Sequence, residues 1–262
     1  MTVGADVWIK FVKRLSALDD GAKRRIENFI GLFGGDFDFT DPDDMNKLIE
    51  YAYTVSQVYG QAAAALACEM YDEIGIESGA LLEPAIPAEL AEYSDVAKAV
   101  NGTAKMRNLE MIGAAVGRLV KMAGTDTTMK NSIRDKAQVA WIPIGDTCAF
   151  CLSLAAGGWK TASESMLKNG HTKHIHGNCD CTYGVRFNKS TKYASYDPQK
   201  YEEIYNDVPE EEGVKMTPKS HINALRRMFY AENKETINAQ KRDAYAKRQG
   251  LESSEAEEIN VN

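Results

Sequence analysis

The chain has 262 residues, of which 44% are hydrophobic and 26% are charged. It is therefore long enough to bury the core of one large domain or two modest ones, and its composition is typical of a globular protein rather than a disordered one. The formal net charge of −7 argues against a protein whose main task is to coat nucleic acid, because such binding depends on a surplus of lysine and arginine.

Residues 1–78 predict an N-terminal helical domain. Their first 20 residues, MTVGADVWIKFVKRLSALDD, carry charges where a signal peptide carries an apolar stretch. No apolar run in the chain approaches the roughly 18 residues that a membrane span needs. We therefore expect a protein that is made and kept in a cytoplasm and has no membrane contact.

The clearest helical signal follows the segment FTDPDD. Thr40 or Asp41 can cap a helix there, and Pro42 suits a first helical position. Apolar residues then recur at spacings of three and four, which is typical of a helix packed in a pair or a bundle. The residues of this stripe are Met45, Leu48, Ala52, Val55, Tyr59, Ala62 and Leu66.

Residues 79–98 contain two prolines and a glycine, and we interpret them as a linker that runs over the surface. Helical spacing returns in residues 99–138, which predict connecting helices. The run AQVAWIPIG, residues 137–145, then has the character of a strand, and CTYGVRF, residues 181–187, alternates as a strand does. We expect residues 139–190 to form a small α+β module.

Residues 191–248 predict a C-terminal helical region, and residues 249–262 predict a disordered acidic tail. We expect a short helix in YDPQKYEEIY and a longer one that Thr217 caps, with Pro218 in its first turn. From Gly213 to Gly250 there are nine Lys/Arg against three Asp/Glu, so the longer helix is basic. Its apolar stripe is Ile222, Leu225 and Phe229. Its cationic residues include Arg226, Arg227, Lys241, Arg242, Lys247 and Arg248.

Cysteine and histidine gather in one part of the chain. Four of the five cysteines and three of the four histidines lie between residues 148 and 181. Cys148 and Cys151 form a C-x-x-C, and His176 and Cys179 form an H-x-x-C. Two such pairs, each on a tight turn, can supply the sulfur and imidazole ligands of a tetrahedral Zn²⁺. Cys181 can replace Cys179 as a ligand or lie behind it, because residues two apart share one face of a strand.

A structural zinc site is the favoured interpretation, since sites rich in thiolates are usually closed and structural. His174 is a weaker candidate than His176 because it lacks the x-x spacing to a cysteine, and Cys68 is expected to be a small core residue.

Three alternatives stay open: a redox-active C-x-x-C, a disulfide and a catalytic zinc. The redox site lacks the preceding βαβ unit of thioredoxin-like proteins, and a disulfide is unusual in a chain without signs of export. No glutamate stands beside His174 or His176 as in the zinc deaminases. Because the sequence also lacks the common nucleotide-binding and hydrolase motifs, we expect no enzymatic activity.

Two segments carry a resemblance to a known family. AWIPIGDTCAFCLSLAAGGW, followed by HGNCDCTYGVRF, resembles the signature of tailed-phage minor head proteins of the Mu F-like class. Upstream, AAAALACEMYDEIG resembles a helix that many of these proteins carry, so the resemblance spans about residues 40 to 190. The chain departs from the family in AAGGW, where an arginine commonly precedes the glycine, and in the additional His174. The positions that match the motif are Cys148, Cys151, His176, Cys179 and Cys181.

The resemblance implies a low-copy minor capsid protein that acts in phage head morphogenesis. It would lie in the virion, inside the capsid near the portal, and in the host cytoplasm during assembly. Its partners would be portal or capsid shell proteins, or both, with no small-molecule substrate implied. From the residues themselves, we expect the basic C-terminal helix to be the surface that meets the portal, the shell or packaged DNA; the alternative is a solvated charged face. We expect a mainly α (α+β) protein in which one structural zinc ion closes the module of residues 139–190. The rival hypothesis is a zinc-dependent or redox enzyme of the host cytoplasm.

Overall fold

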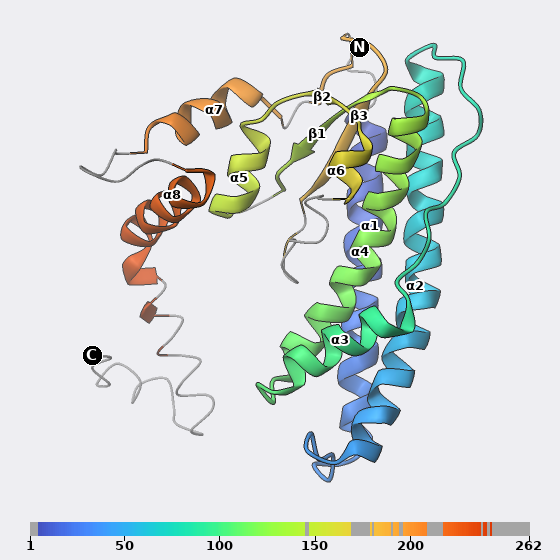
Figure 1. The fold of residues 1–262 in the computed structure, drawn as a ribbon, viewed down its shortest axis with the longest axis vertical. Helices are drawn as coiled ribbons and strands as arrows, with labels where there is room; N and C mark the ends of the chain where they lie inside the picture. The colour runs from blue at the N-terminus through green and yellow to red at the C-terminus, as the bar shows by residue number, and fades with distance from the viewer. Residues whose placement is uncertain are drawn as a thin grey trace. The chain divides into compact units, whose positions relative to one another are not determined.

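The structure, a computed structural model, describes residues 5–144, 147–168, 179, 181–189, 191–193, 196–208, 217–236, 238, 239 and 242. In these residues the fold is mainly helical with one small antiparallel sheet, which confirms the predicted fold class (Figure 1). The elements, in chain order, are α1 (Ala5–Gly31), α2 (Pro42–Glu77), α3 (Tyr93–Ala104), α4 (Leu109–Arg134), β1 (Gln138–Ile142), α5 (Ala149–Ala155), β2 (Lys160–Thr161), α6 (Glu164–Lys168), β3 (Thr182–Arg186), α7 (Pro198–Asn206) and α8 (Pro218–Glu232). Among the described residues, no helix is both long and apolar enough to cross a membrane.

The long helices α1, α2 and α4 pack side by side as a bundle (Figure 1). The predicted start of α2 is confirmed, because the Asp41 carboxylate caps the helix by accepting a 2.8 Å hydrogen bond from the N–H of Asp43, and Pro42 opens it. The predicted stripe of α2 faces the core. Met45, Leu48, Ala52, Val55 and Leu66 are buried, and Tyr59 and Ala62 are half-buried.

The segment between α2 and α3 lies against α4 without forming a helix or a strand. Asn131 of α4 pairs with the main chain of Ile86 in both directions, since its Oδ1 accepts from the N–H at 3.0 Å and its Nδ2 donates to the carbonyl at 2.8 Å. The hydroxyl oxygen of Thr127 accepts from the N–H of Ala88 at 3.0 Å. These bonds satisfy backbone groups that have no ladder partner, so the linker follows one defined path along the helix.

The sheet has the strand order β2-β1-β3, and both pairings are antiparallel. The longer pairing runs from Gln138 opposite Arg186 to Ile142 opposite Thr182. Nearly every residue of β1 and β3 is buried. Because neighbouring residues of a strand point to opposite faces, both faces of this pair are covered. Both strands lie where the sequence predicts them.

The chain divides into two compact units. The first contains Met1–Asp146 and Gly157–Pro198, which hold the bundle and the sheet, and the second contains Thr147–Ala156 and Gln199–Asn262, which hold α5, α7 and α8.

In the second unit, the predicted apolar stripe of α8 forms the core. Leu225 is fully buried, and Ile222 and Phe229 pack around it with Ala149 and Leu152 of α5. The predicted cap is also confirmed: the Thr217 hydroxyl accepts from the N–H of Ser220 in a capping box, and Pro218 opens the helix.

Candidate metal centre

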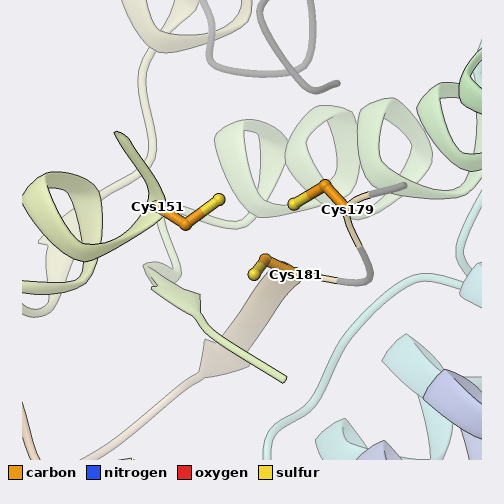
Figure 2. Close-up of side chains that lie close together, drawn as sticks. All are labelled: Cys151, Cys179 and Cys181. Carbon is orange, nitrogen blue, oxygen red and sulfur yellow. The ribbon is translucent and has the colours of Figure 1, made fainter. Parts of the chain in front are cut away.

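Three cysteine thiols converge: those of Cys151, Cys179 and Cys181 (Figure 2). Their Sγ atoms all lie within 4.8 Å of one another, and the residues are only 1%, 3% and 5% exposed. A tetrahedral Zn²⁺ with bonds of about 2.3 Å sets its sulfur ligands about 3.8 Å apart. The three thiols are therefore close enough to bind one metal ion.

All five cysteines lie within the described residues, and none of them forms a disulfide. Thiolate sulfur is a soft donor, and a cluster of three suits Zn²⁺ or another metal that prefers sulfur over the oxygen ligands of Mg²⁺ or Ca²⁺. The chemistry of the donor set thus fits the zinc ion that the sequence predicts.

The C-x-x-C pair is placed by the start of α5. Cys148 is the N-cap residue, and its Sγ accepts a 3.5 Å hydrogen bond from the N–H of Cys151, a role that an oxygen side chain usually fills. Ala149 and Leu152 hold the helix in the apolar core of its unit. Cys148 and Cys151 each precede one of these core residues, and they are likewise three positions apart. They therefore lie together on the side of the helix next to its core-facing side.

The second cysteine pair leads into the sheet. Cys181 immediately precedes β3, and the main-chain carbonyl of Cys179 accepts a 2.7 Å hydrogen bond from Nζ of Lys121 in α4. Only one residue separates the two cysteines, and both thiols belong to the cluster (Figure 2). The sequence leaves open which of the two is a ligand, and the structure brings both within reach.

The two other predicted ligands are Cys148 and His176. Cys148 is half-buried and is not a member of that group. His176 lies outside the described residues, as does His174. A fourth ligand from Cys148 or His176 therefore stays a prediction.

One cysteine and one histidine of the chain, Cys68 and His221, lie outside the segment of residues 148–181. Cys68 is half-buried in α2, where burial raises the pKa of its thiol. The ring of His221 in α8 stacks on Tyr205 at 3.9 Å between centroids, and its Nε2 donates to the Tyr205 carbonyl at 2.5 Å. Neither residue belongs to the thiol cluster.

Sequence reasoning missed one residue that touches the site. Lys121 is only 3% exposed, although lysine is rarely buried unless it is paired. The one available signal was its position in the run AAVGRLVKMAG, where the helical spacing puts it among buried residues.

Comparison with known proteins places the chain among viral proteins. The sequence model of the VG15 protein family matches residues 3–208, which cover most of the chain and include all of its cysteines. The comparisons find no match among curated proteins or among solved structures. The matching family is one of viral gene proteins. The chain belongs to the VG15 protein family.

Proposed function

We propose that this viral protein is a minor capsid protein of a tailed phage, a low-copy component that acts in head morphogenesis from the capsid interior near the portal. A structural zinc ion bound by the clustered cysteines stabilises it. The observation that carries the proposal is the buried thiol cluster of Cys151, Cys179 and Cys181. These three residues belong to the motif by which the chain resembles the Mu F-like minor head proteins.

The burial of the thiols favours a structural metal over a catalytic one. A catalytic zinc keeps one coordination position open to water or substrate, whereas structural sites are closed by protein ligands. Cys151, Cys179 and Cys181 are each no more than 5% exposed. With Cys148 or His176 as the fourth ligand, the coordination sphere would be complete.

The partners in this proposal are portal or shell proteins, with the C-terminal basic helix as a further contact for packaged DNA. The apolar stripe of α8 packs in the core of the second unit, whereas Arg226 and Arg227 of the same helix are exposed. Arg242 is half-buried, and Lys241, Lys247 and Arg248 lie outside the described residues. An exposed arginine pair beside a buried stripe supports a polar or anionic partner on this face.

Quantitative mass spectrometry of purified virions of the source phage tests the proposed function. We expect a small, reproducible number of copies of this chain relative to the major shell protein, and a comparable number in DNA-free heads. Absence from the particles, together with abundance in infected cells, would contradict a capsid role.

The rival, an enzyme with a reactive thiolate, makes a different prediction in native alkylation. A structural metal site predicts that Cys151 is labelled slowly until a chelator is added, with Cys68 as an internal reference outside the cluster. Rapid labelling of Cys151 in the native, metal-loaded chain would instead favour the redox enzyme.

A further inference from the structure

A lysine and an aspartate are buried together in the bundle, next to the cysteine segment. Lys121 of α4 is 3% exposed and Asp19 of α1 is 1% exposed. The Nζ of Lys121 lies 2.9 Å from Oδ2 of Asp19 and donates a 2.7 Å hydrogen bond to the main-chain carbonyl of Cys179. Lys23, one turn after Asp19, brings its Nζ to 2.8 Å from the same carboxylate oxygen.

This arrangement holds the Lys121 ammonium in one place. An ammonium group has three N–H donors, of which one is directed at the carboxylate and another at the carbonyl of Cys179. The carboxylate is fixed in turn by Lys23 and by its packing over Gly117, where a Cβ atom would lie 1.8 Å from Oδ1 of Asp19. Two helices therefore determine the position of the group that binds Cys179.

Stability alone does not account for the pair. A buried ion pair is often no more stable than apolar residues of the same volume, because desolvation of both charges offsets their attraction. An apolar residue at position 121 would also leave the Cys179 carbonyl without this donor. The feature that distinguishes Lys121 from Lys23 is its bond to a cysteine of the metal motif.

We propose that Lys121 is a positioning residue of the metal centre. It fixes the backbone at Cys179, and through it the directions of the Cys179 and Cys181 thiols, before the ion binds. This inference rests on the zinc site of the proposed function.

The test compares two lysine-to-methionine variants of the full chain. Lys121→Met removes the donor to Cys179, whereas Lys23→Met removes a lysine from the same carboxylate without touching the cysteine segment. Zn²⁺ affinity is measured by competition with a chromophoric chelator, and ligand geometry by the absorption spectrum of the Co²⁺-substituted protein. We expect Lys121→Met to bind Zn²⁺ about 10- to 100-fold more weakly, as do other variants that lose a group orienting a metal ligand, with a changed Co²⁺ spectrum. Lys23→Met should stay within about threefold of wild type and keep its spectrum, because the Asp19–Lys121 pair and the bond from Lys121 to the Cys179 carbonyl are both retained.

Equal affinities for the two variants, or an unchanged Lys121→Met protein, would overturn the positioning role while leaving the zinc site intact. A wild-type chain that binds no Zn²⁺ would overturn both the site and this inference. If Lys121→Met does not fold, the double variant Asp19→Asn/Lys121→Met, which leaves no unpaired carboxylate in the core, replaces it with the same expectation.

Discussion

The indole Nε1–H of Trp8 donates a 3.2 Å hydrogen bond to the main-chain carbonyl of Tyr183, which lies 175 residues further along the chain. Trp8 belongs to the first turns of α1 and is 3% exposed, and Tyr183 lies in β3. Two side chains of the bundle thus donate hydrogen bonds to main-chain carbonyls of this segment: Trp8 to that of Tyr183, and Lys121 to that of Cys179. The segment that carries two of the clustered cysteines is therefore shaped by helices as well as by strand pairing.

Trp8→Phe should destabilise the protein by roughly 1–3 kcal/mol, because it removes the donor to a buried carbonyl and leaves a smaller ring in the core. Urea unfolding followed by circular dichroism measures the effect. Trp159→Phe is the matched control. Trp159 is half-buried and stacks on the Arg186 guanidinium at 4.5 Å, a contact that a phenyl face retains, so its cost should be below about 1 kcal/mol. Equal costs for the two variants would contradict the role of the Trp8 bond.

Gly117→Ala should destabilise the bundle by about 1–3 kcal/mol, because the new methyl group would displace the buried carboxylate of Asp19. The Cβ position lies 1.8 Å from Oδ1 and 3.1 Å from Cγ of that residue. Gly102→Ala in α3 is the control, since nothing lies within 4 Å of its Cβ position, and better helix propensity should stabilise it by up to about 1 kcal/mol. Thermal unfolding of both variants would show opposite shifts, and a stabilised Gly117→Ala protein would refute the close packing.

Lys136→Gly should stabilise the protein by roughly 1 kcal/mol, because Lys136 has a φ of +52° at the end of α4, a conformation that favours glycine. The N–H of Ala137 donates to the Ser132 carbonyl at 2.9 Å, which closes a Schellman motif. At the end of α2 the equivalent position is Gly79, with a φ of +67°. Gly79→Lys should accordingly destabilise the protein by a similar amount. Denaturant titration measures the free energy of unfolding of both variants, and shifts of the same sign would contradict the prediction.

Asp135→Asn should lower stability at pH 7 and have little effect at low pH. The hydrogen bond from Arg134, 2.7 Å to Oδ2, and that from the Tyr71 hydroxyl, 2.9 Å, keep the pKa of Asp135 below its usual value. The stabilisation from this carboxylate is therefore fully present above a pH of about 4, the ordinary pKa of aspartate, and is lost as the pH falls through the lower folded-state pKa. Because Asp135 is half-buried and its partner Arg134 is partly exposed, the difference at pH 7 should be about 1 kcal/mol. A stability difference that persists unchanged at pH 2 would contradict this linkage.

Local patterns predicted the parts of the fold that depend on neighbouring residues. The Asp41 cap with Pro42, the Thr217 cap with Pro218, and both long strands are specified by residues within a few positions of each element. The C-x-x-C pair, expected on a tight turn, lies where α5 begins, with Cys148 as the N-cap residue and Cys151 in the first turn.

Contacts between distant segments were beyond sequence reasoning. Nothing near Lys121 in the chain indicates its partners Asp19 and Cys179. Asp19 reaches Lys121 because α1 packs against α4, and Cys179 reaches it because the segment that leads into β3 passes α4. Gly21 illustrates the same limit, since α1 runs unbroken through it and its missing side chain makes room for the ring of Tyr59, 2.7 Å from the Cβ position. Spacing identified candidate metal ligands, but only the folded chain shows that Cys179 and Cys181 both approach Cys151.

Native mass spectrometry of the full chain, purified without chelators, tests the zinc site most directly. The wild-type chain should carry one zinc ion, as should Cys68→Ser, whose cysteine lies outside the cluster. Cys151→Ser should retain none after dialysis, because serine is a poor ligand for a soft, thiolate-rich site. Wild-type protein without metal, or a Cys151→Ser variant that holds zinc as fully as wild type, would contradict the account.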